Sequence, residues 1–149
     1  MKKLLVGLLA LGSIATYAHP ENSDSIYRVG EGSKIKVLKD INIKPKNHSG
    51  RMNDWDPSSP KTKYCVVNPR KVTANDRAIL KGSEYAIKDV TLERLYGTQS
   101  NYIQAIITTD NPDFTLKCVM ENKNDITIKE FKKINKGYLK LKLAKPERI

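Results

Sequence analysis

The segment YIQAIITTDNPDFTLKCVM, residues 102–120, decides the expected fold. Apolar and polar residues alternate through 102–108 and again through 114–120, and the Asn-Pro-Asp sequence at 111–113 between them is typical of a turn. Alternation with a period of two places one row of side chains on each face of a β-strand. The segment therefore predicts two antiparallel strands joined by a tight connection. Their apolar row consists of Ile103, Ala105, Ile107, Phe114, Leu116, Cys118 and Met120.

Similar short apolar runs lie on both sides of this segment. Residues 34–43 alternate except at Leu38 and Lys39, which predicts a bulge or two short strands. The whole set is typical of a mainly β fold, and we expect a small antiparallel β-sandwich or barrel of about seven short strands. The other expected strands are 63–68, 78–80, 85–95 and 138–143.

The hydrophobic period changes from two to that of a helix near the C-terminus. Thr127 and Glu130 have the spacing of a capping box, in which each residue hydrogen-bonds the backbone of the other. Ile128, Phe131 and Ile134 follow at helical spacing. These residues predict one short helix that buries its apolar side and exposes its lysines.

The length and composition exclude several classes of protein. With 149 residues, the chain suits one domain with a real core. Two cysteines are too few for a disulfide-dense miniprotein, and charged residues at 29% exclude a polytopic membrane protein. The 27 Lys+Arg and 16 Asp+Glu give a formal net charge of +11. We therefore expect a basic protein with a single β-rich domain, over residues 26–149.

The N-terminus has the features of a secretory signal peptide. Lys2 and Lys3 precede an apolar stretch at 4–14, and small residues stand at the −3 and −1 positions if cleavage follows Ala18. The apolar stretch is shorter than the roughly 20 residues that span a bilayer. We predict a signal peptide at 1–18 and an exported, periplasmic or secreted, protein, the alternative being an uncleaved anchor. Residues 19–25 are expected to form a flexible N-terminus.

Cys65 and Cys118 each lie in a strand-like run. Exported proteins meet an oxidising environment in which two cysteines pair. A redox or nucleophilic thiol is the alternative, but CxxC spacing is absent and no His or basic residue is placed to stabilise a thiolate. The sequence therefore predicts a Cys65–Cys118 disulfide.

The long segment from Lys44 to Thr62 has no strand pattern and holds the single Trp of the chain. Loops of this length in a compact domain are usually functional or mobile. Trp55 between Asp54 and Asp56 is a candidate platform for a sugar or a peptide. The alternatives are that Trp55 closes one end of the core, or that the acids bind calcium, although the ligand spacing of an EF-hand is absent.

A second idea for this segment concerns copper. Cleavage after Ala18 would make His19 the first residue, and its amine and imidazole could bind Cu(II) together with His48. These two residues resemble the N-terminal histidine brace of copper oxygenases and copper carriers, without any further motif of those families. A small secreted hydrolase or copper-binding protein using 44–62 is therefore the alternative function.

Motifs for catalysis are absent from the sequence. It has no G-x-S-x-G, no H-E-x-x-H and no glycine-rich phosphate loop, and it predicts no cofactor. We therefore favour a non-enzymatic binding or structural domain over an enzyme.

The charge distribution suggests a partner for such a domain. Residues 126–149 carry eight Lys or Arg and two Glu. Lys132 and Lys133 on the helix and Lys140 and Lys142 on the last strand are the candidate binding residues. They would attract an anionic envelope polymer, a lipid surface or an acidic protein. Nucleic acid is the least favoured partner because Arg is sparse and aromatics are not interleaved. The alternative is a solubilising surface.

Overall fold

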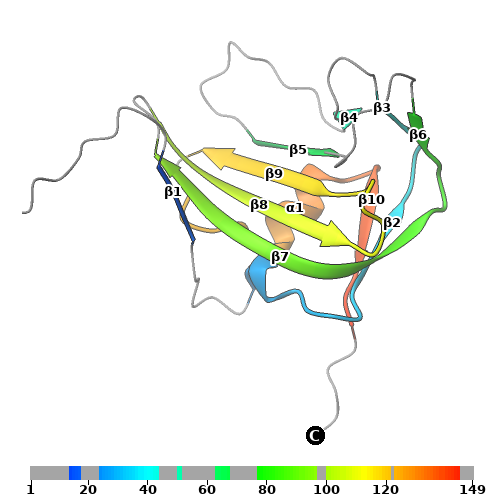
Figure 1. Cartoon of the computed structure of the whole chain (residues 1–149), viewed down its shortest axis with the longest axis horizontal. Coiled ribbons are helices and arrows are strands. Elements are labelled where there is room, and N and C mark those ends of the chain that lie inside the picture. Colours follow the sequence, from blue (N-terminus) through cyan, green and yellow to red (C-terminus); the bar gives the residue numbers. More distant parts are fainter. Residues whose placement is uncertain are drawn as a thin grey trace, which may run out of the picture.

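The computed structural model shows an antiparallel, mainly β fold with one α-helix, as the sequence predicts (Figure 1). It describes residues 14–17, 24–43, 50–51, 63–67, 77–96, 100–121 and 123–144. The strands are β1 (Ile14–Tyr17), β2 (Lys34–Val37), β3 (Ile41–Ile43), β4 (Gly50–Arg51), β5 (Lys63–Val67), β6 (Arg77–Ile79), β7 (Glu84–Tyr96), β8 (Asn101–Thr109), β9 (Leu116–Glu121) and β10 (Leu139–Lys142). The helices are the 3₁₀ helix η1 (Ile26–Arg28) and α1 (Ile128–Ile134).

Eight of the described strands form one sheet, in the order β10-β2-β7-β8-β9-β5-β4, with β1 beside β7. β7 has 13 residues and is strongly curved (Figure 1). Its register with β8 shifts between Ile87 and Asp89, and such a bulge bends the strand that carries it. Within the described residues the end strands β10 and β4 do not pair with each other, and the arrangement is consistent with a small β-sandwich.

The remaining two strands, β3 and β6, pair with each other beside the β2–β7 ladder. The break between β2 and β3 matches the two short strands that the irregularity at Leu38 and Lys39 allows. At the break, the Asp40 side chain replaces a backbone partner, because it accepts a hydrogen bond of 2.7 Å from the Lys81 N–H. Gly82, opposite the break, has a φ of 91°, which favours glycine. This interruption, with the short strands β1 and β4, raises the number of strands above the expected seven.

The core lies between the curved sheet and α1, which is behind β7–β9 in Figure 1. Alternation along the strands produces it, because the inward residues of β2, β7, β8, β9 and β10 are all buried. Phe131 of α1 is 1% exposed within the same cluster, whereas Ile128 and Ile134 are only partly buried at its border. The inward sheet residues are Ile35, Val37, Ile87, Val90, Leu92, Ile103, Ala105, Ile107, Leu116, Cys118, Met120, Leu139 and Leu141.

The predicted capping box starts α1. The Thr127 side chain accepts a hydrogen bond from the Glu130 N–H (3.1 Å), and the Glu130 carboxylate accepts one from the Thr127 N–H (3.0 Å). Both partners satisfy backbone donors that a helix start leaves unpaired. The helix therefore begins where the sequence predicts.

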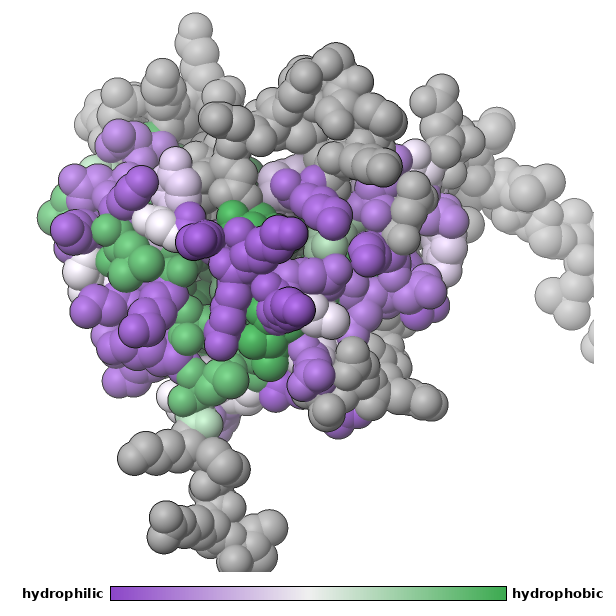
Figure 2. Space-filling model, turned by 180° about the vertical axis from the view of Figure 1, so that it is seen from behind, coloured by the Kyte–Doolittle hydropathy of each residue, from purple (hydrophilic) through white to green (hydrophobic). Residues whose placement is uncertain are grey.

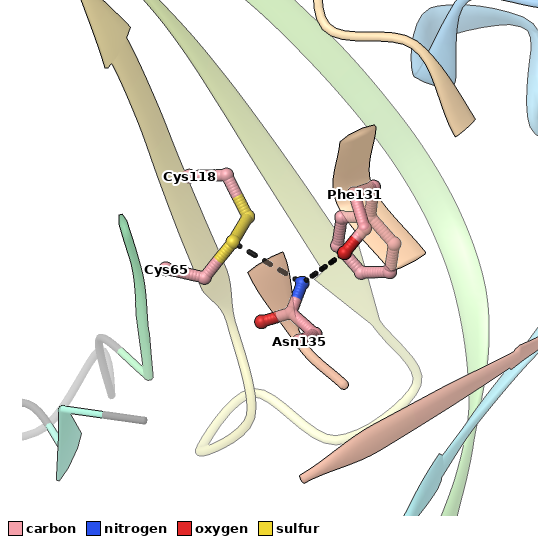
Figure 3. The surroundings of a disulfide bond; sticks show 4 residues. All are labelled: Cys65, Cys118, Phe131 and Asn135. Atoms are coloured by element: carbon pink, nitrogen blue, oxygen red, sulfur yellow. Dashed lines mark hydrogen bonds between the residues drawn. A yellow bond between two sulfur atoms is a disulfide. The ribbon is translucent and has the colours of Figure 1, made fainter. Parts of the chain in front are cut away.

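Cys65 and Cys118 form a disulfide between directly opposite residues of β5 and β9 (Figure 3). Their Cα atoms are 4.0 Å apart, somewhat closer than the 4.4 Å at the lower end of the usual range. Both are fully buried, and the Asn135 side chain donates hydrogen bonds to Cys65 Sγ (3.3 Å) and to the Phe131 carbonyl (3.0 Å). The bond therefore also anchors the C-terminal end of α1, and it removes both thiols.

The folded part of the chain includes Asp24 and Ser25, which the sequence analysis assigns to a flexible N-terminus. Ser25 is fully buried, and its hydroxyl donates a hydrogen bond of 2.7 Å to Asp125. The Ile26 N–H donates another, of 2.8 Å, to the Ile126 carbonyl. These contacts hold the segment before η1 against the segment before α1. No helix in the described ranges is long and apolar enough to span a membrane.

Candidate functional site

Four lysines share the outward side of β2 and β10. Lys140 lies directly opposite Lys36, and Lys142 lies directly opposite Lys34. The residues between them in each strand are buried in the core, so the lysines point away from it. We call Lys34, Lys36, Lys140 and Lys142 the lysine face.

β7 adds one carboxylate, Glu84, beside the lysine face. Lys142 Nζ lies 2.8 Å from one of its oxygens and Lys34 Nζ lies 3.8 Å from the other. The hydrogen bond from Lys142 lowers the pKa of Glu84, against a smaller effect of desolvation, and the charges of Lys142, Lys34 and Lys36 lower it further. Glu84 is therefore shared by two lysines, and Lys36 and Lys140 form no salt bridge with any residue of the described ranges.

The register of the lysine face opposes stability. Directly opposite residues of antiparallel strands have Cβ atoms about 4.5–5.5 Å apart, and like charges at this spacing are destabilising. Four lysines and one glutamate leave a net charge of +3. Glu84 lies directly opposite Lys36 on the other side of β2 and offsets part of this repulsion, whereas Lys140, on the end strand β10, has no carboxylate opposite it within the described residues. An anionic partner would relieve the repulsion that remains.

The lysines of α1 lie on its solvent side, as predicted. Lys132 and Lys133 are exposed, while Phe131 between these lysines and the sheet is buried. These two candidate binding residues border different hollows in the surface. Lys132 borders the larger one, of about 520 Å³, and Lys133 borders one of about 240 Å³.

The larger hollow lies where α1 and the end of β10 meet. Its described lining consists of Asp24, Thr127, Ile128, Lys129, Lys132 and Leu143. Leu143 directly follows Lys142 but continues the inward row of β10, so the hollow and the lysine face lie on opposite sides of this strand. Figure 2, which views the molecule from the side of α1, shows hydrophobic surface between groups of hydrophilic side chains. Two cations of the helix, Lys129 and Lys132, therefore border an apolar depression.

The smaller hollow lies between α1 and the strands β5 and β9. Glu130 is at its border, and burial raises the pKa of that carboxyl. Hydrogen bonds from Thr127 and the nearby charge of Lys123 outweigh this effect, so the pKa of Glu130 is lowered overall. Lys123 Nζ lies 3.5 Å from Glu130. Glu130 is thus committed to the capping box and to a salt bridge. The described lining is Lys63, Met120, Glu130, Lys133 and Ile134.

The other predicted site residues lie outside the described residues. These are Asp54, Trp55 and Asp56 of the long segment, and His19 and His48 of the copper hypothesis. The alternative function, a small secreted hydrolase or copper-binding protein, therefore remains a prediction from the sequence. Within the described ranges, no group of three or more His, Cys, Asp or Glu could hold a metal ion.

Sequence reasoning missed Lys34 and Lys36, which make up half of the lysine face. Their alternation with Ile35 and Val37 predicts a strand but does not by itself indicate a binding surface. The available signal was the match between the Lys-x-Lys of β2 and the Lys-x-Lys of β10, since two such strands carry their lysines on one side if they pair in register.

Comparison with known proteins adds no assignment. No family model matches the sequence, and we find no significant similarity to a curated protein or to a solved structure.

Proposed function

We propose that the protein is an exported, non-enzymatic binding domain that associates with an anionic component of the cell envelope through the lysine face. The observation that carries the proposal is the register of β10 on β2, which sets Lys140 opposite Lys36 and Lys142 opposite Lys34. This pairing concentrates positive charge on a rigid part of the sheet, where the lysine positions are set by backbone hydrogen bonds. A polymer or surface with closely spaced negative charges matches such an array.

Export is supported by the sequence and is compatible with the structure. The charged and apolar N-terminal segments and the small residues before Ala18 have the order of a signal peptide. The buried Cys65–Cys118 disulfide suits an oxidising compartment. Cleavage after Ala18 would remove β1, which pairs with Glu93–Tyr96 of β7. The same residues of β7 also pair with β8, so the sheet would keep its other ladder there.

A binding experiment on the exported protein tests this proposal. The full-length gene is expressed in a secreting host, and mass spectrometry of the recovered protein shows whether the chain begins at His19. Binding to polyglutamate and to vesicles of phosphatidylglycerol with phosphatidylcholine is then measured at about 0.05 M and 1 M salt. Exposed charges are screened beyond about 3 Å at 1 M salt, so binding should be lost there.

Two variants with the same change in charge locate the surface. The first carries K34Q, K36Q, K140Q and K142Q and should bind at least tenfold more weakly at low salt. The control changes four lysines elsewhere and should bind much more like the parent. It carries K63Q on β5, K81Q in the turn before β7, K88Q on β7 and K117Q on β9. Equal weakening in both variants, or binding that survives 1 M salt, would overturn the proposal.

A further inference from the structure

We infer that the larger hollow, between α1 and the end of β10, binds a hydrocarbon chain with an anionic head, as in an acidic membrane lipid. The inference rests on the proposed function and narrows its partner from any polyanion to a lipid. It combines an apolar floor with a pair of cations at the rim.

The apolar part of the hollow comes from the inward row of β10. Leu139 and Leu141 of this row are 5% and 6% exposed, whereas Leu143, the next residue in the row, is 49% exposed. Leu143 thus extends the core row beyond the end of the strand and into the hollow, where Ile128 lies on the other side. Covering these two side chains with a hydrocarbon chain removes apolar surface from water, at roughly 25 cal/mol per Å².

The charged part of the hollow comes from one side of α1. Lys129 and Lys132 are three residues apart, so they are neighbours on the helix surface, and both are exposed. Asp24 also lines the hollow, so the three charged side chains leave a net charge of +1. Thr127 is already occupied in the capping box with Glu130. The two lysines are therefore the groups that would bind an anionic head.

The size and the position of the hollow favour a lipid over a polymer. Its volume of about 520 Å³ falls within the range of about 300–1,000 Å³ that is usual for small-molecule sites. A glycopolymer or a nucleic acid would use the lysines but gain little from Leu143 and Ile128. A lipid uses both, because its chain covers the apolar floor while its head meets Lys129 and Lys132.

Dodecyl phosphate, used below its micelle concentration, is the probe that separates chain from charge. It is titrated into the ¹⁵N-labelled exported protein, and binding is followed by the amide shifts of Ile128, Lys129, Lys132 and Leu143. The change L143S should weaken its binding on the order of fivefold, since one apolar wall is lost. L80S is the matched control, because Leu80 is also an exposed leucine (61%) but does not line the hollow. K129Q with K132Q should also weaken binding of dodecyl phosphate.

Polyglutamate, which has no hydrocarbon chain, distinguishes failure of this inference from failure of the proposed function. Saturable binding of dodecyl phosphate that is weakened by L143S and not by L80S, with polyglutamate binding unchanged in both, supports the lipid site. If polyglutamate binds but L143S leaves dodecyl phosphate binding unchanged, the lipid inference is wrong and the proposed function stands. If neither probe binds, both are wrong.

Discussion

The disulfide and the lysine face are two uses of the same backbone geometry. Cys65 and Cys118 lie directly opposite each other on β5 and β9, as Lys36 and Lys140 do on β2 and β10. The cysteine pair is buried and covalently joined, whereas the lysine pair is outward-facing and repulsive. The covalent bond and the positive charge are therefore concentrated towards opposite ends of one sheet. Substitutions at the disulfide should therefore lower stability and leave binding unchanged.

α1 connects the two regions. Its C-terminal end is held at the disulfide by Asn135, and Phe131 enters the core, while Lys132 on its outer side borders the hollow near the end of β10. Loss of the anchor should therefore destabilise the domain, whereas loss of an outer lysine should not.

Removal of the disulfide is the largest expected change. Replacing Cys65 and Cys118 by alanine frees a loop of 53 residues and should lower the free energy of unfolding by roughly 4 kcal/mol in the chain-entropy estimate. Urea denaturation measures this, with the reduced parent protein as a second measure of the same loss. Polyglutamate binding by the molecules that remain folded should stay at the parent level. A loss below about 1 kcal/mol would show that the bond contributes little to stability.

Truncation of Phe131 is the next largest change. Phe131→Ala leaves a cavity between α1 and the sheet and should cost about 3 kcal/mol or more. Lys132→Ala, one residue along the helix and exposed, is the control and should change stability by less than about 0.5 kcal/mol. Equal effects of the two substitutions in thermal denaturation would contradict the packing of α1 described above.

Loss of the capping box should have a smaller effect that depends on pH. Thr127→Ala should cost about 1 kcal/mol near neutral pH, because the start of α1 loses its cap. The pKa of Glu130 is lowered in the folded protein, so its contribution is present above the unfolded pKa of about 4.3 and is lost as the pH falls through the folded pKa. The stability difference between the parent and Glu130→Gln should therefore shrink below about pH 4. A difference that grows on acidification would contradict this assignment.

The features that the sequence predicted well are local. Alternation in residues 102–120 predicts β8 and β9, and the Thr127–Glu130 spacing predicts the start of α1, because each depends on contacts between neighbours in the chain. The cysteine pair spans 53 residues but could be predicted because the chain has only two cysteines. This long-range contact was therefore predicted from the number of cysteines and not from a local sequence pattern.

The features that could not be predicted from the sequence depend on the register of strands that are distant in the chain. β10 pairs with β2 across about a hundred residues, and a shift by one residue would turn Lys140 and Lys142 towards the core. Local alternation does not show which two strands pair. The larger hollow has the same origin, because Asp24 and Leu143, from opposite ends of the chain, meet there.

We propose that the lysine face favours binding at a cost in stability, and one substitution tests both parts of this proposal. K140Q removes the lysine opposite Lys36, which has no salt bridge within the described residues, while Lys36 keeps Glu84 opposite it on β7. The free energy of unfolding and the affinity for phosphatidylglycerol vesicles are measured in the same low-salt buffer. The variant should be more stable by a few tenths of a kcal/mol and should bind more weakly, because one of the two opposed lysine charges is gone. A variant that is less stable and binds as well as the parent would contradict the proposal.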